Sequence, residues 1–306
     1  MKNALPTVAV AAALCCTAFV PSAFAQEAKI TPVAQFEEDS GAQERINFSG
    51  KLRMLSQRIP SAACHLAAGV EVEASKKLLM GASAEFSKIV NALQFGDPEL
   101  NITGAEERRK TVAKIDELRV AWVPMKKAAD AMLAGDTSDA QLKPILDANM
   151  GVLKHAAELV SVIVGQYSNP NELVQADSML IDLAGRQRML TQKMSKESCM
   201  VATGYGTADT VEALNGTVTT FDTSLSALTS GMPALGIRRP PSAGIEAGLV
   251  EVAKHWNKAK PMLEQIAAGS ALNADDDAKK FTELNVTMKT MNEVVGMYAK
   301  ALKKEG

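Results

Sequence analysis

The sequence predicts an all-α protein made of two tandem four-helix-bundle repeats, about eight helices in total, related by a pseudo-twofold axis. Apolar residues recur at three- and four-residue steps, and the alternation of apolar and polar residues that is typical of strands is absent. Aromatic residues make up only 4% of the chain, and most prolines lie between the periodic stretches. A motif that occurs twice at a fixed spacing divides these helices into two copies of one unit.

The repeated motif reads INFSGKLRMLSQR at residues 46–58 and IDLAGRQRMLTQK at residues 181–193. Every matched position differs by 135. The same offset aligns residues well outside the motif: it pairs Cys64 with Cys199, Phe86 with Phe221, Leu93 with Leu228, Gly96 with Gly231 and Pro98 with Pro233. We therefore expect one repeat at residues 26–168 and the second at residues 169–306, each of ordinary domain size.

The first 25 residues have the composition of a cleavable secretory signal. A basic residue precedes an apolar run at residues 4–20, and small residues mark a cleavage site at residues 22–25. A lipoprotein signal is the alternative, because two cysteines lie within the run, but the bulky Leu14 directly before Cys15 argues against it. No later segment has the apolar length of a membrane span. We expect a protein of the bacterial periplasm that is not inserted in the membrane once the signal is removed.

Charge and composition bear on the function class. The formal net charge is −2 at pH 7, which gives no electrostatic attraction to nucleic acid or anionic lipid. The histidines and cysteines show no metal-ligand or haem-attachment spacing. The sequence also lacks a nucleophile–base pair, a carboxylate dyad and a cofactor loop. We expect no metal, no cofactor, no catalytic residues and no enzymatic activity.

In the first repeat, residues 26–35 form a lead-in, and the apolar periodicity predicts helices at residues 36–68, 72–95 and 104–134. Gly69 ends the first helix, the sequence Gly-Asp-Pro at 96–98 ends the second, and Pro124 is expected to kink the third. Residues 135–138 read Gly-Asp-Thr-Ser, a terminator followed by a cap, and the fourth helix then ends near Tyr167.

The joint between the repeats is the sequence Ser-Asn-Pro at residues 168–170. Asn169 suits the N-cap of the next helix and Pro170 suits its first turn. The cycle then repeats, and the longest loop lies at residues 231–241. The predicted helices of the second repeat span residues 170–203, 208–229, 243–267 and 275–303.

On a helix, the motif places Gly50, Arg53 and Gln57 on one face, since they are separated by three and four residues. Cys64 lies three turns further along the same face. A glycine inside a helix costs up to about 1 kcal/mol relative to alanine, so its use here is close approach by another helix or by a ligand. The arginine offers a planar fork of donors that fits carboxylate, nitrate or phosphate.

The second copy carries the same set, Gly185, Arg188 and Gln192, before Cys199. Two copies of one fold commonly pair about a pseudo-twofold axis. If the first helices of the two repeats meet there, the two arginines face one another and favour an anion between them. The same symmetry brings Cys64 opposite Cys199, and in an oxidising compartment we expect these two cysteines to form a disulfide.

Two alternatives stay open. In the first alternative, Arg53 and Arg188 are ordinary surface residues or pair locally with Asp182 or Glu44. In the other, the chain is a structural or adaptor module that binds a membrane or envelope protein and has no small-molecule ligand. Arginine faces buried against each other favour the anion site, whereas a broad exposed apolar surface favours the adaptor.

Residues 184–194, AGRQRMLTQKM, closely resemble the signature of the type IV pili methyl-accepting chemotaxis transducer N-terminal domain. That family is similar to the periplasmic sensor domain of nitrate/nitrite-responsive histidine kinases. Residues 49–58, SGKLRMLSQR, resemble the same signature in weaker form. In the nitrate sensors, the related segment lies on the first helix of a four-helix bundle, and two copies hold one anion between paired arginines.

The resemblance implies that Arg53 and Arg188 are anion donors, and that Gly50 and Gly185 admit the ligand to the backbone. This chain departs from those receptors because both copies lie in one polypeptide without a signalling module, and because Pro60 stands where the second copy has Ser195. We therefore expect a non-enzymatic sensor-type protein that binds nitrate, nitrite or a small carboxylate between its repeats. The expected partner is a membrane-bound sensor or transporter.

Overall fold

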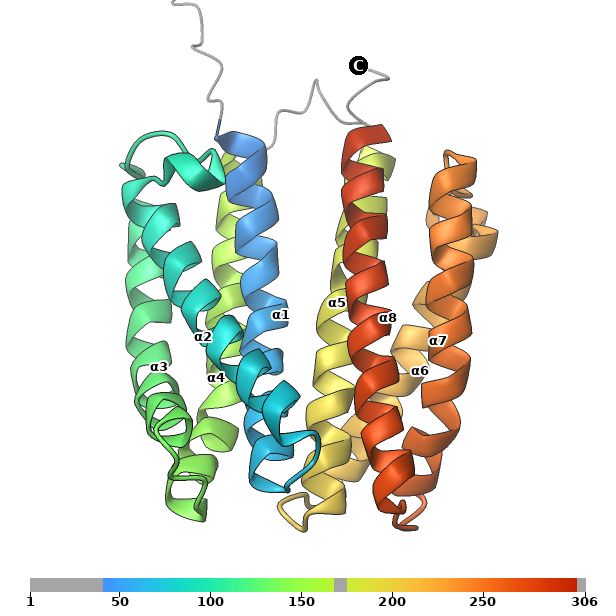
Figure 1. The fold of residues 1–306 in the computed structure, drawn as a ribbon. Coiled ribbons are helices and arrows are strands. Elements are labelled where there is room, and N and C mark those ends of the chain that lie inside the picture. Colours follow the sequence, from blue (N-terminus) through green and yellow to red (C-terminus); the bar gives the residue numbers. More distant parts are fainter. Residues whose placement is uncertain (1–40, 168–174, 302–306) are drawn as a thin grey trace, which may run out of the picture. The chain divides into compact units, whose positions relative to one another are not determined.

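The computed structural model describes residues 41–167 and 175–301, which all belong to one unit of the chain, residues 39–306. The expected secretory signal and the joint between the repeats lie outside the described residues. The described part contains eight α-helices and two short 3-10 helices, and no strand (Figure 1). The predicted all-α fold with eight helices is confirmed.

The helices form two groups of four. The first group consists of α1 (Ala42–Ala67), α2 (Val72–Phe95), α3 (Arg109–Leu133) and α4 (Asp139–Tyr167), with the 3-10 helix η1 (Pro98–Leu100) between α2 and α3. The second group consists of α5 (Gln175–Ala202), α6 (Ala208–Ser230), α7 (Ala243–Ala267) and α8 (Ala274–Ala301), with η2 (Pro233–Leu235) between α6 and α7. Within each group consecutive helices pack together and the last helix returns to the first, as in a four-helix bundle.

The predicted helix at residues 104–134 was wrong at its start, because α3 begins only at Arg109. The backbone before α3 has other partners. The buried guanidinium of Arg45 donates to the carbonyl oxygens of Thr103 at 3.1 Å and Gly104 at 2.7 Å, and the amide of Glu106 donates to Gln94 at 2.9 Å. These contacts hold residues 103–106 against α1 and α2 as a loop, and tertiary contacts override the local helical pattern.

The two groups repeat each other in detail. An isolated backbone bridge joins Asp97 to Ile102 in the first group, and the same bridge joins residues 232 and 237 in the second. The rings of Phe86 and Trp122 lie 4.4 Å apart, and the equivalent pair in the second group lies 4.5 Å apart. Gly96 has a φ of 81°, and a Cβ there would lie 2.8 Å from the carbonyl oxygen of Gly104, so only glycine fits this turn.

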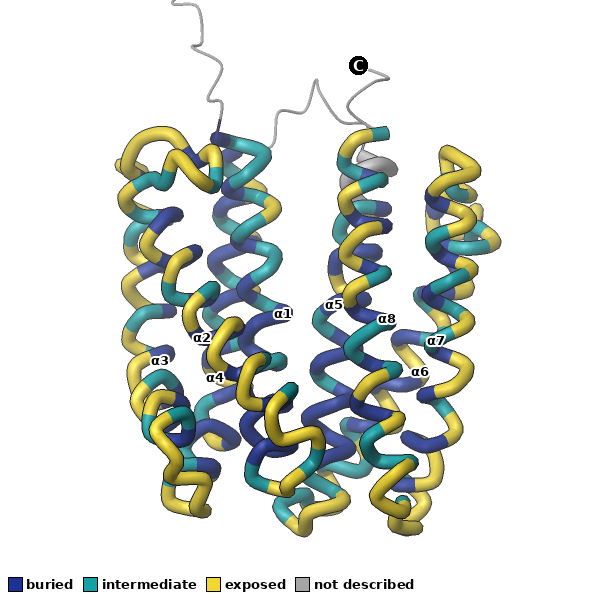
Figure 2. Tube along the Cα trace, in the orientation of Figure 1, coloured by how far each residue is buried: buried dark blue, intermediate teal, exposed yellow. Residues whose placement is uncertain are grey.

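The first helices of the two groups, α1 and α5, pack against each other (Figure 1). Each also contacts the helices of its own group, chiefly α2 and α4 for α1 and α6 and α8 for α5. The central part of each is therefore buried on nearly every side, as the dark segments in Figure 2 show. Many of these buried side chains are polar, among them Gln57, Arg188 and Lys196. Buried polar side chains need hydrogen-bond partners, which makes the interface between α1 and α5 the candidate site.

Among the described helices, none is both long enough and apolar enough to cross a lipid bilayer.

Candidate functional site

Residues of α1 and α5 face one another across the boundary between the repeats. Cys64 and Cys199 form a disulfide with their Cα atoms 6.2 Å apart, as predicted. One turn earlier, the hydroxyl of Ser61 donates to that of Ser195 at 2.8 Å. The two helices therefore run parallel with matched levels. We call the facing residues 53–64 of α1 and 182–199 of α5 the seam.

Arg188 lies in the seam and is only 5% exposed. Its Nη1 donates to the side-chain oxygen of Asn292 on α8 at 2.7 Å, and its Nε has no hydrogen-bond partner among the described residues. Burial, and to a smaller extent the positive charge of Arg53, lower the pKa of Arg188 to about 10. The two guanidinium groups thus lie close enough to repel each other, and no carboxylate of the described residues forms an ion pair with Arg188.

Arg53 has a partner that the second arginine lacks. Its Nη2 donates to one carboxylate oxygen of Asp182 at 3.0 Å, and the other oxygen accepts from Nε of Arg186 at 2.8 Å. The side chain of Arg53 is 14% exposed, so the interpretation of both arginines as surface residues was wrong. The alternative pairing with Asp182 is correct for Arg53, although the bond crosses between repeats rather than staying within one.

Gly50 and Gly185 lie beneath the arginines of their own copies. A Cβ at Gly50 would lie 3.9 Å from Nη2 of Arg53, and one at Gly185 would lie 3.7 Å from Nη2 of Arg188. Helical side chains lean toward the N-terminus of their helix, so each guanidinium extends back over the residue three positions earlier. Each glycine therefore leaves its own arginine room along the helix backbone.

The two glutamines of the motif are buried in the seam. The ammonium group of Lys196 donates to the amide oxygen of Gln57 at 2.9 Å. Because an ammonium group has no acceptor, this bond turns the NH₂ of Gln57 the other way, where it lies 3.4 Å from the hydroxyl of Ser56. The side-chain nitrogen of Gln192 is buried without a partner among the described residues. Of the two glutamines, Gln192 thus has the amide donor without a partner, whereas the amide nitrogen of Gln57 already donates to Ser56.

Lys196 is the residue of this site that the sequence did not reveal. It is 3% exposed, and its ammonium group also donates to Asn149 of α4 at 2.8 Å, so it ties α5 to both α1 and α4. Burial lowers its pKa to about 8, while Glu197 raises it and Lys193 lowers it. Arg188, Gln192 and Lys196 follow one stripe of α5 at four-residue steps, and this spacing was the available signal.

The charge balance of the seam decides what it can bind. Arg53, Arg188 and Lys196 bring three positive charges. Of the two carboxylates in the seam, Asp182 is bonded to Arg53 and Glu197 is bonded to Lys193. Burying an unpaired charge is costly, so this excess of donors favours an anion and disfavours a metal cation. Guanidinium groups suit the planar shape of nitrate or of a carboxylate.

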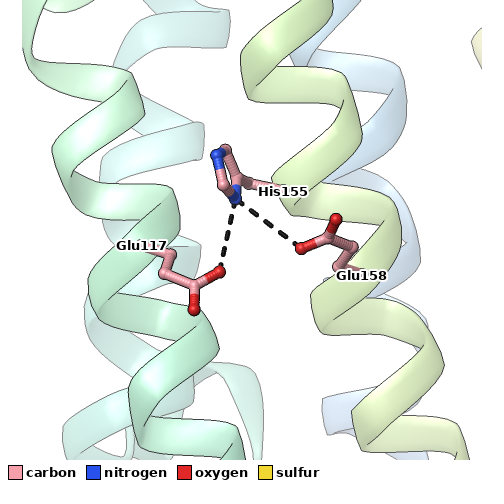
Figure 3. A group of neighbouring side chains, drawn as sticks. All are labelled: Glu117, His155 and Glu158. Atoms are coloured by element: carbon pink, nitrogen blue, oxygen red, sulfur yellow. Dashed lines mark ion pairs between the residues drawn. The ribbon is translucent and has the colours of Figure 1, made fainter.

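A second cluster of ionisable groups lies on α3 and α4. Nδ1 of His155 is 3.5 Å from Glu117 and 3.8 Å from Glu158 (Figure 3). The ammonium group of Lys114 also contacts both carboxylates, at 2.7 Å and 2.9 Å. Since a lysine already bridges the two carboxylates, we interpret this cluster as an ion-pair network rather than as a metal site.

Comparison with known proteins adds two findings. A family described as "Type IV pili methyl-accepting chemotaxis transducer N-term" matches residues 35–148 and 173–291. The methyl-accepting chemotaxis protein McpN of Pseudomonas aeruginosa is 33% identical over 87 residues. That alignment covers 28% of this chain and only 16% of the relative.

Proposed function

The chain belongs to the family of the type IV pili methyl-accepting chemotaxis transducer N-terminal domain, and from this membership we propose that it is a non-enzymatic, sensor-type binding protein. Its ligand would be a small anion, namely nitrate, nitrite or a small carboxylate, held in the seam. The observation that carries the proposal is Arg188, a buried guanidinium beside Arg53 that forms no ion pair with any carboxylate among the described residues.

The seam supports one anion for each chain. Arg53 and Arg188 approach from opposite repeats, and the amide nitrogen of Gln192 adds a neutral donor one turn further along α5. A trigonal anion offers acceptors in one plane, which suits two guanidinium groups that approach from two sides. In this proposal the two repeats of one polypeptide supply what two separate subunits would otherwise supply.

The adaptor alternative would place the arginines on a broad apolar surface. Arg188 is instead buried and Arg53 nearly so, which supports the anion site. The disulfide supports the periplasm as the location, since such bonds persist in oxidising compartments. The relationship to a methyl-accepting chemotaxis protein supports a membrane-bound sensor as the partner to which the bound anion is presented; a transporter is the other candidate.

Calorimetry with the purified chain tests the proposal. We expect nitrate, nitrite or acetate to bind at one anion per chain, and the double variant Arg53→Ala/Arg188→Ala to bind at least tenfold more weakly. The matched control is Lys126→Ala/Lys254→Ala, which removes two positive charges from exposed helix surfaces. Unchanged anion affinity in the arginine variant, with circular dichroism showing an intact fold, would show that the seam is not the anion site.

A further inference from the structure

A groove separates the two repeats beside α1, α2 and α8. It has a volume of about 900 Å³, within the range of pockets that hold small organic molecules. Residues of both repeats line it, and most are apolar: Leu55, Leu78, Ala82, Phe281, Val286 and Met288. The groove borders the seam, because Leu55 and Arg58 line it, but neither Arg53 nor Arg188 does.

The charged residues of the groove are mostly basic. Arg58, Lys77, Lys88 and Lys289 line it, and Glu85 is the carboxylate among the lining residues. Glu85 is itself bonded to Lys51. The guanidinium of Arg58 contacts the sulfur of Met288 at 3.8 Å and has no ion pair in the described part of the chain. Burial lowers the pKa of Arg58 and the charge of Glu85 raises it, which agrees with a guanidinium held against apolar walls.

The second repeat shows how the same position is neutralised there. Lys193 is the equivalent of Arg58, and its ammonium group lies 2.5 Å from a carboxylate oxygen of Glu197. Thr217 donates to the other oxygen of that carboxylate at 2.8 Å. A half-buried lysine, a buried carboxylate and a buried hydroxyl thus form a complete set between α5 and α6.

The first repeat lacks two members of this set. The positions of Glu197 and Thr217 are occupied by Ala62 and Ala82, and Ala82 lines the groove. The first copy therefore has the cation without the built-in carboxylate, and this cation lines the groove. The missing carboxylate and the apolar walls indicate the chemistry of a ligand for this groove: a carboxylate attached to an apolar body.

We propose that this groove binds an amphipathic monocarboxylate, such as a medium-chain fatty acid, with its carboxylate on Arg58 and its hydrocarbon along Leu55, Leu78 and Phe281. The basic rim formed by Lys77 and Lys289 adds attraction for the negative charge. This site does not depend on anion binding in the seam.

The test is calorimetric titration of the full chain with decanoate below its micelle concentration, and with decanol as an analogue without the carboxylate. We expect saturable binding of decanoate that is at least tenfold tighter than binding of decanol. Arg58→Met should weaken decanoate at least tenfold, and Lys126→Met, which removes an exposed charge, should leave it unchanged. Absence of saturable decanoate binding, or equal affinities of the two variants, would overturn the proposal.

A second pair of variants covers the case in which Arg58→Met fails to fold. Ala62→Glu introduces the carboxylate of the second copy beside Arg58 and should abolish decanoate binding, whereas Ala62→Gln, of the same size but neutral, should retain it. Loss of binding in both variants would assign the effect to steric filling and overturn the role of Arg58. Unchanged decanoate binding by Arg53→Ala/Arg188→Ala separates this site from the seam, whatever nitrate does.

Discussion

Cys64 and Cys199 are separated by 135 residues and are joined by a disulfide that ties α1 to α5. The bond connects the same position of two copies of one fold, so it lies close to the pseudo-twofold axis that relates the copies. Each group of helices has an apolar core of its own. The disulfide therefore joins two units that each contain the packing of a bundle.

We expect removal of this disulfide to destabilise the protein without unfolding it. Closing a loop of this length restricts the unfolded chain, which typically contributes about 2–4 kcal/mol. The variant Cys64→Ser/Cys199→Ser should lower the free energy of unfolding by about that amount in urea denaturation. The wild type treated with reductant should behave like the variant, and equal stabilities of oxidised and reduced protein would contradict the expectation.

The repeat predicted more of this structure than local patterns did. Local patterns gave the bounds of α2 and α7: apolar periodicity predicts both helices, and a glycine after α2 and a serine before α7 mark their ends. The facing of α1 and α5 followed from symmetry, because equivalent side chains must meet if the copies pair about one axis.

The partners of the seam residues could not be predicted in the same way. An offset identifies equivalent positions, but it does not identify which residue of the other copy lies opposite. Arg53 bonds to Asp182 while Arg188 bonds to Asn292, although the arginines are equivalent. Lys196 stands where the first copy has Ser61, so symmetry gave no indication of a buried ammonium group.

Lys196 should give the stability a dependence on alkaline pH. Its pKa is lowered to about 8 in the folded protein, chiefly by burial, from the ordinary value of 10.5. Between these values the unfolded chain binds more protons, so the stability of the wild type rises with pH relative to a chain without this lysine. The difference in unfolding free energy between wild type and Lys196→Met should therefore shift in favour of the wild type from pH 8 to pH 10.

Urea denaturation at several pH values measures this difference. Lys126→Met is the control, because Lys126 lies on the surface of α3. The difference in unfolding free energy between this variant and the wild type should stay constant with pH. A constant difference for Lys196→Met as well would mean that its ammonium group is not destabilised by burial.

His65 should make the fold sensitive to acid. It is fully buried, its Nδ1 lies 2.8 Å from the carbonyl oxygen of Ser61, and burial together with the charge of Lys280 lowers its pKa to about 4. Between pH 6.5 and pH 4 the unfolded chain binds the extra proton, so the contribution of neutral His65 to stability is lost as the pH falls. The variant His65→Met, which has the residue of the second copy at position 200, should lose less stability over this range.

Thermal unfolding of both proteins from pH 7 to pH 4 provides the comparison. Carboxylates titrate at the lower end of this range in both proteins, so only the difference between them reports on His65. Parallel loss of stability in wild type and variant would contradict the assignment.

Gly185→Ala should separate stability from ligand binding. Alanine in place of a helical glycine stabilises a helix by about 0.5–1 kcal/mol. The new methyl group would lie 3.7 Å from Nη2 of Arg188, an ordinary contact that nevertheless takes the space along which the guanidinium extends. We expect a protein that is equally or more stable and binds nitrate more weakly.

Gly216→Ala in α6 is the matched control, because a Cβ there meets no atom within 4 Å. This variant should be stabilised and should bind nitrate as the wild type does. Calorimetry and urea denaturation of both variants decide the matter, and equal nitrate affinities would show that the motif glycine has no part in the site.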